Sequence, residues 1–212
     1  MKSHIVIIRF HYKEDDPRFD WRLAYFKSMV LPRLLNQSDQ NFVIGIRCNP
    51  CHEEIFKKLS DKIITFQTKD DTARYKIGNN NKKYFEDFVK WDDVIGLEKY
   101  DIQSGLDSDD LIGKDYIKII NDSFRNEVEK RHLCFQPQLF NAMTLAIKPM
   151  MQYHSKRGSA FMSILQPNKS EYYHFIYEIS HISLWKISNK SIIIPAGHCW
   201  ATAHLLNEST GK

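Results

Sequence analysis

Three acidic side chains stand within four residues of the chain, and their spacing suits a metal ion. They belong to the segment Leu106-Asp107-Ser108-Asp109-Asp110, which follows an apolar run from Ile102 and precedes a helical pattern. Carboxylates this close raise one another's pKa unless a cation neutralises them. Mg²⁺ and Mn²⁺ prefer oxygen ligands and commonly bind one or two carboxylates together with substrate phosphates. The pattern therefore predicts the metal and phosphate site of a transferase that uses a nucleotide or a sugar nucleotide.

The same acidic segment has three other interpretations, and the flanking residues disfavour two of them. Aspartates often close turns or cap helices, so either later acid of the motif could cap a helix that begins near Lys114. A calcium-binding EF-hand is disfavoured because, counting from Asp107, Ile112 stands where glycine is needed and Lys118 where glutamate is needed. A phosphatase motif of the D-x-D-x-T type is disfavoured because Leu111 replaces the threonine.

Composition indicates one globular domain. The chain has 212 residues, which is enough to bury a core without disulfides, and its 42% hydrophobic content is typical of a folded protein. The net charge of +4 is mild and gives no reason to expect a nucleic-acid partner. No segment reaches the roughly 20 apolar residues of a membrane span, and the first apolar run is too short for a signal peptide. Four cysteines without a disulfide pattern fit a reducing compartment, so we expect a cytoplasmic protein.

Strand-like and helix-like patterns alternate along the chain. A continuous apolar run at residues 4–10 predicts a strand buried on both faces, and a helical stripe follows at residues 23–34, with Pro32 expected to kink or end it. Further strands are predicted at 42–46, 63–66, 102–106 and 132–135, separated by helical or polar segments. This alternation predicts an α/β domain with a mainly parallel central sheet flanked by helices. Ligands of such sheets bind at the carboxyl ends of the strands, where the acidic motif lies.

Several short motifs resemble those of a known family. They are Arg9-Phe10, Trp21-Arg22-Leu23, Leu31-Pro32 with Gln37 and Asn41-Phe42, the acidic segment, and Trp200-x-x-x-His204-x-x-Asn207. Together they resemble the putative rhamnosyltransferase family, a branch of the family 2-like glycosyltransferases with the GT-A fold, over about residues 5–207. The resemblance implies a single GT-A-like domain, a nucleotide-diphosphate sugar as donor, a divalent metal at a D-x-D motif, and transfer to a hydroxyl of a glycan. It does not establish rhamnose as the sugar.

The resemblance also implies roles for individual metal-binding residues. Asp109 would ligate Mn²⁺ or Mg²⁺, Asp107 would reach the metal through water or reach the ribose, and Asp110 would orient the loop. His204 would be a further metal ligand from the end of the chain, because imidazole is a reasonable partner for Mn²⁺. The nearby His198 competes for that role, and a surface or core histidine is the alternative for both.

Donor contacts are expected from other charged residues. Arg9 would lie near the base and ribose, and Asp70 and Asp71 would contact the base or ribose, unless they only cap a turn. The loop Lys156-Arg157-Gly158 carries two cations beside a glycine, so Arg157 is a candidate for a phosphate contact, with a solvated turn as the alternative.

A catalytic base is expected in an aromatic segment late in the chain. His174, Glu178 and His181 are four and three residues apart, so a helix would place them on one face. If that helix face is directed into the cleft, it would supply the catalytic base and its partner. Otherwise it forms an ordinary polar helix surface. The sequence lacks a clear Glu-Asp dyad, and inversion or retention of stereochemistry stays open.

We expect residues 1 to about 130 to bind the donor and about 131–212 to bind the acceptor. Two alternatives remain. One is a non-catalytic carbohydrate-binding or assembly protein on a decayed transferase fold. The other is a sugar-phosphate nucleotidyltransferase, which would usually carry a glycine-rich signature after the first strand; residues 10–16 contain no glycine.

Overall fold

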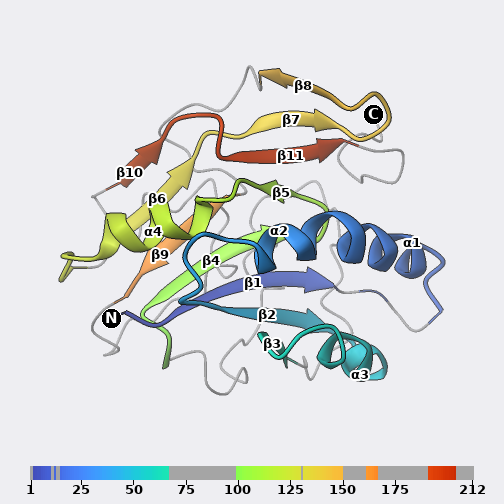
Figure 1. Cartoon of the computed structure of the whole chain (residues 1–212). Coiled ribbons are helices and arrows are strands. Elements are labelled where there is room, and N and C mark those ends of the chain that lie inside the picture. Colours follow the sequence, from blue (N-terminus) through green and yellow to red (C-terminus); the bar gives the residue numbers. More distant parts are fainter. Residues whose placement is uncertain are drawn as a thin grey trace, which may run out of the picture.

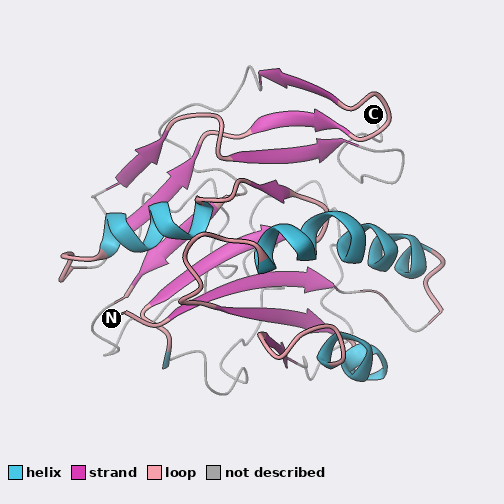
Figure 2. Ribbon diagram, in the orientation of Figure 1, coloured by secondary structure: helices cyan, strands magenta, loops and turns pink. Residues whose placement is uncertain are grey.

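The computed structural model describes residues 2–10, 12, 15–66, 99–129, 131–149, 161–166 and 191–203. Within these residues two sheets are present (Figure 1). The larger has seven strands in the order β10-β6-β9-β4-β1-β2-β3, and the smaller has four in the order β5-β11-β7-β8. The helical segment that follows the first strand lies across one face of the larger sheet. The smaller sheet lies at the top of the view (Figure 2).

The larger sheet confirms the predicted strands and places the first of them near its centre. Its strands are β1 (His4–Phe10), β2 (Val43–Cys48), β3 (Ile63–Phe66), β4 (Ile102–Asp107), β6 (Arg131–Phe135), β9 (Met162–Leu165) and β10 (Ser191–Ile194). Strand β1 pairs in parallel with both β2 and β4, and every one of its side chains except that of Arg9 is buried. The sheet is mixed, because β9 runs antiparallel between β4 and β6.

The predicted helix after β1 is present and continues past the proline. It consists of α1 (Arg18–Tyr25), a π-helical turn at Phe26–Val30, and α2 (Leu31–Leu35). Pro32 lies in the first turn of α2, where a missing N–H is tolerated, and the π-helical turn directly precedes it. The remaining described helices are α3 (Glu53–Lys57), which follows a 3₁₀ turn at Pro50–His52, and α4 (Tyr116–Phe124).

The smaller sheet was not predicted, and it links the acidic motif to the end of the described chain. Its strands are β5 (Leu111–Ile112), β7 (Gln138–Asn141), β8 (Ala146–Pro149) and β11 (Cys199–Ala203). Strand β11 pairs antiparallel with β5 and parallel with β7. The alternative in which the acids cap a helix is wrong: β5 follows them directly, and α4 begins only after Asp115.

Aromatic side chains fill the space between the carboxyl end of β1 and the helices. The ring of Phe10 contacts those of Phe26 and Phe56 at centroid distances of 5.4 and 4.8 Å, and Phe19 lies 6.2 Å away. All but Phe19 are fully buried, and Phe19 is 6% exposed. Because buried aromatic rings contribute large apolar areas, this cluster fixes α1 against the end of β1, where the acidic motif also lies.

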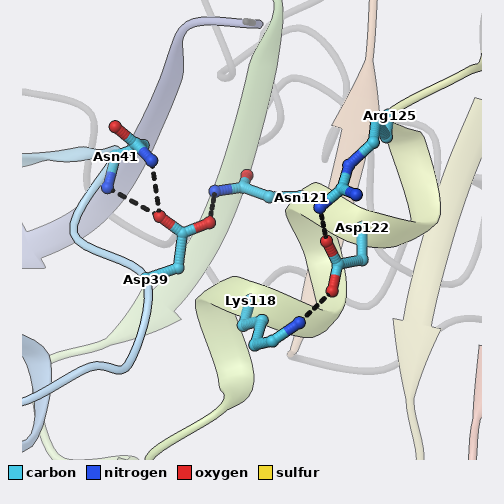
Figure 3. Close-up of polar contacts among 6 residues, drawn as sticks. All are labelled: Asp39, Asn41, Lys118, Asn121, Asp122 and Arg125. Atoms are coloured by element: carbon cyan, nitrogen blue, oxygen red, sulfur yellow. Dashed lines mark hydrogen bonds and ion pairs between the residues drawn. The ribbon is translucent and has the colours of Figure 1, made fainter.

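A chain of polar contacts leads from the surface to the buried His4 at the amino-terminal end of β1, away from the acidic motif. Asp39 accepts hydrogen bonds from Asn41 and from the Asn121 amide, and the neighbouring Asp122 on α4 contacts Lys118 and Arg125 (Figure 3). The Asn121 carbonyl is 2.8 Å from His4 Nδ1. The other ring nitrogen of His4 is 2.8 Å from the Ser104 hydroxyl. Since Asn121 presents its oxygen, His4 Nδ1 carries the proton and Nε2 accepts from Ser104.

The burial of His4 predicts a loss of stability in acid. Burial lowers the His4 pKa from 6.5 to about 4. Between these values the unfolded chain binds a proton that the native protein does not, so the free energy of unfolding falls as the pH decreases through this window, by about 3 kcal/mol in total. Urea unfolding at about pH 7, 5.5 and 4.5 should show a shallower decline for His4→Gln than for wild type. Equal declines would contradict the assignment.

Candidate functional site

The acidic motif forms a tight turn at the carboxyl edge of the larger sheet. Asp107 is the last residue of β4, and the backbone N–H of Asp110 donates to its carbonyl at 3.2 Å before β5 begins. This confirms that a central parallel strand delivers the motif to the edge where ligands of α/β sheets bind. The three carboxyl groups thus begin at the same turn, but each has a different partner.

Asp107 pairs with Arg9 across two neighbouring strands. Arg9 Nη2 donates to Asp107 Oδ1 at 2.8 Å, and the two residues occupy the same register position of β1 and β4. Arg47 of β2 occupies the next position in that row, beside Arg9. The side chain of Asp107 is 40% exposed and that of Arg9 is 23% exposed, so an entering ligand can reach both. The structure thus brings Arg9, a predicted donor-contact residue, against the acidic motif.

Asp109 pairs with Arg22, which sequence reasoning did not assign to the site. The Arg22 guanidinium on α1 contacts Asp109 Oδ2, and the two side chains are only 10% and 11% exposed. Arg22 also lies over the Trp21 ring, with 5.7 Å between its guanidinium carbon and the ring centroid. Burial lowers the pKa of Arg22, but the charges of Asp109 and Tyr12 outweigh it, so the pKa rises overall and the cation is retained. The available sequence signal was the position of Arg22 directly after Trp21, within the first turns of the helix.

Asp110 is buried and is held by the last described strand. The backbone N–H of Thr202 in β11 donates to Asp110 Oδ1 at 3.0 Å, and the Tyr25 hydroxyl lies 3.5 Å from the Thr202 hydroxyl. Burial, followed by the charges of Asp107 and Asp109, raises the pKa of Asp110 well above its usual 3.8. Strand β11 therefore fixes the loop, and Asp110 holds a proton more firmly than an ordinary carboxyl group.

This raised pKa predicts that neutralising Asp110 stabilises the protein. Native Asp110 keeps its proton to a higher pH than the unfolded chain does, so its contribution is favourable in acid and is lost as the pH rises from about 4. Asp110→Asn keeps an oxygen for the Thr202 N–H without a charge. Without divalent metal, we expect the variant to be about 1 kcal/mol more stable than wild type near pH 7 and equal to it near pH 4. Denaturant unfolding at both pH values measures this; a less stable variant at pH 7 would contradict it.

The carboxylates of the turn fit a divalent cation that is shared with a substrate. Asp107 contacts Arg9 and Asp109 contacts Arg22, while burial, followed by the charges of Asp107 and Asp109, raises the pKa of Asp110. Mg²⁺ and Mn²⁺ need only one or two carboxylates when phosphates complete the coordination. Within the part of the chain that the structure describes, no three His, Cys, Asp or Glu side chains converge on one metal position. Among the described residues, a metal at this turn would take Asp107 and Asp109 together with oxygen atoms of a substrate.

Several predicted site residues lie outside the described residues. They are Asp70, Asp71, Arg157, His174, Glu178, His181 and His204. His198, the competitor of His204, lies beside the other end of β5: its carbonyl accepts from the Gly113 N–H at 2.8 Å, and its ring is 6.3 Å from that of Phe135. None of the described helices is long and apolar enough to cross a membrane.

A mixed α/β sheet with an acidic turn at its carboxyl edge, beside a small second sheet, is the architecture expected of a glycosyltransferase of the GT-A type. The family model for putative rhamnosyl transferase matches residues 6–210, and the chain belongs to that family. The motifs found in the sequence thus indicated the correct family.

Solved structures of TarS from S. aureus are similar to this chain. TarS 1–349 in complex with UDP-GlcNAc aligns over 100% of this chain and 61% of the TarS 1–349 chain, with 12% identity and a TM-score of 0.56. Another TarS structure aligns over 96% of the chain and 37% of TarS, with 13% identity and a TM-score of 0.53. The chain thus spans less than two thirds of these structures, and the likeness is one of fold. No curated protein matches the sequence.

Proposed function

We propose that the protein is a metal-dependent transferase that moves a sugar from a nucleotide-diphosphate donor to a hydroxyl group of a polysaccharide or other glycan. The observation that carries this proposal is the acidic turn itself: three carboxyl groups follow β4 at the carboxyl edge of the sheet, with an accessible Asp107 beside Arg9. A nucleotide-diphosphate donor is further supported by the TarS fold, which was solved with UDP-GlcNAc. Rhamnose is one sugar to test.

The reaction breaks the bond between the anomeric carbon and the diphosphate oxygen and forms a bond from that carbon to the acceptor oxygen. The acceptor's proton passes to a base, and the electron pair of the broken bond stays on the diphosphate. A Mn²⁺ or Mg²⁺ ion would supply charge stabilisation for that leaving group. Arg9 contributes a second positive charge at the edge, and Asp110 with the Thr202 N–H holds the turn in place.

On this proposal Asp109 and Asp107 hold the metal with the diphosphate, and His204 completes the set. His204 follows directly after β11, whose Thr202 binds Asp110. The nucleotide would then be contacted by Arg9, Asp70, Asp71 and Arg157.

The base is proposed among His174, Glu178 and His181, within an acceptor-binding half from about residue 131. The cytoplasm is the proposed compartment, and the four cysteines carry free thiols.

The proposal is tested by thermal unfolding with nucleotides. A ligand that binds only the native state raises the melting temperature. UDP, dTDP and GDP, each with Mn²⁺, Mg²⁺ or a chelator, should give a shift with one nucleotide that requires the metal. A carbohydrate-binding protein on an inactive transferase fold would instead show no shift of the melting temperature with any nucleotide. The nucleotides are tested at about millimolar concentration, which saturates a site of micromolar affinity.

A further inference from the structure

Arg22 is a buried cation in contact with the motif. It comes from α1, which is distant in sequence from the acidic turn, and it contacts Asp109 with both side chains about one-tenth exposed. The side chain rests on the Trp21 ring, and Tyr12 shares a hydrogen bond with it. A buried charge without a partner is strongly destabilising. Arg22 and Asp109 therefore require each other as long as no other charged group enters.

The proposed function brings two such groups to the same position. A divalent cation would compete with Arg22 for Asp109, and the donor's diphosphate would offer oxygens to the released guanidinium. Arginine presents a planar fork of donors that matches a phosphate group, which a lysine ammonium does not. The Arg22 guanidinium already lies over the Trp21 ring, and it would have a charged partner both before and after the donor enters.

We propose that Arg22 is an internal counter-ion that is exchanged on donor binding: it neutralises Asp109 in the free protein, and it contacts the donor's diphosphate when Asp109 turns to the metal. This inference rests on the proposed function and extends it by one phosphate-binding residue. It makes Arg22 a competitor of the metal when nucleotide is absent and a partner of the metal when nucleotide is present.

The exchange predicts that one substitution changes two affinities in opposite directions. In Arg22→Gln, Asp109 is free of its competitor, so Mn²⁺ alone should bind about tenfold more tightly. The phosphate contact is lost at the same time, so UDP or the nucleotide that wild type prefers should bind about 10- to 100-fold more weakly at saturating Mn²⁺. Isothermal titration calorimetry of the whole chain measures both, with Mn²⁺ alone and with nucleotide at saturating Mn²⁺.

Two further variants complete the experiment. Arg18→Gln is the matched control, because Arg18 lies one turn earlier on α1 and pairs with Asp16 away from the motif; both affinities should stay at the wild-type value. Arg22→Lys keeps a charge opposite Asp109 if the glutamine variant does not fold. It should bind Mn²⁺ alone as wild type does but bind nucleotide about tenfold more weakly, since it lacks the fork.

The outcomes separate this inference from the proposed function. If wild type binds no nucleotide with or without Mn²⁺, the proposed function fails. If wild type binds nucleotide with Mn²⁺ but Arg22→Gln weakens both affinities or neither, the exchange is wrong, and Arg22 only supports the fold. The same conclusion holds if Arg22→Lys retains full nucleotide affinity. Opposite changes in the two affinities support the exchange.

Discussion

Replacing Asp109 by asparagine should lower the free energy of unfolding by about 4 kcal/mol, because it leaves the Arg22 guanidinium buried opposite a neutral amide. The two side chains are 10% and 11% exposed, so water cannot replace the lost carboxylate. Urea unfolding of Asp109→Asn and wild type near pH 7 measures the difference. The variant should also lose metal-dependent nucleotide binding, since Asp109 is the proposed ligand.

The double variant Asp109→Asn with Arg22→Gln is the control for this interpretation. It removes both charges, so it should recover part of the stability that Asp109→Asn loses. A single variant as stable as wild type would show that the buried pair contributes little. A double variant that is less stable than Asp109→Asn would show that the loss has another cause.

Asp107→Asn should have the reverse profile, with little change in stability and a large loss of activity. Its pair with Arg9 is partly exposed, and such pairs contribute at most about 1 kcal/mol. Charge stabilisation of the leaving diphosphate by a metal contributes several kcal/mol, so losing this ligand should lower the rate of donor cleavage by about 100-fold or more. The rate of nucleotide-diphosphate release under saturating donor measures this effect, and unfolding in urea is the control.

The comparison of the two neighbouring acids separates structure from chemistry. If Asp107→Asn cleaves the donor as fast as wild type, the assignment of Asp107 to the metal and donor is wrong. If it unfolds as readily as Asp109→Asn, the exposed pair with Arg9 matters more for the fold than its geometry indicates.

Patterns within short segments predicted much of the larger sheet. The apolar run of β1 predicted a strand buried on both faces, as the structure has it, and the acidic motif was correctly placed at the end of β4. The strand β9 and its antiparallel direction were missed, because direction depends on pairing between distant segments. The smaller sheet was missed for the same reason: β5 has two residues and exists only through its pairing with β11.

The candidate site shows the same division. Asp107, Asp109 and Arg9 could be found from residue types and their positions after strands. Arg22 and Thr202 could not, because their roles depend on contacts over 87 or more residues of sequence, as in the Thr202 N–H that binds Asp110. A backbone amide leaves no local pattern, and the Trp21-Arg22 motif does not show that this arginine meets Asp109. The base and His204 stay predictions.

The central claim is metal-dependent cleavage of a nucleotide-diphosphate sugar, and its most direct test is release of the nucleotide diphosphate from a panel of UDP-, dTDP- and GDP-sugars by wild type. We predict release from the sugars of one nucleotide when Mn²⁺ or Mg²⁺ is present, abolition by a chelator, and recovery when the metal is restored. Release that is the same with chelator and with metal would contradict metal dependence. No release from any sugar nucleotide, with metal and with candidate glycan acceptors present, would contradict the account of the site as a transferase centre.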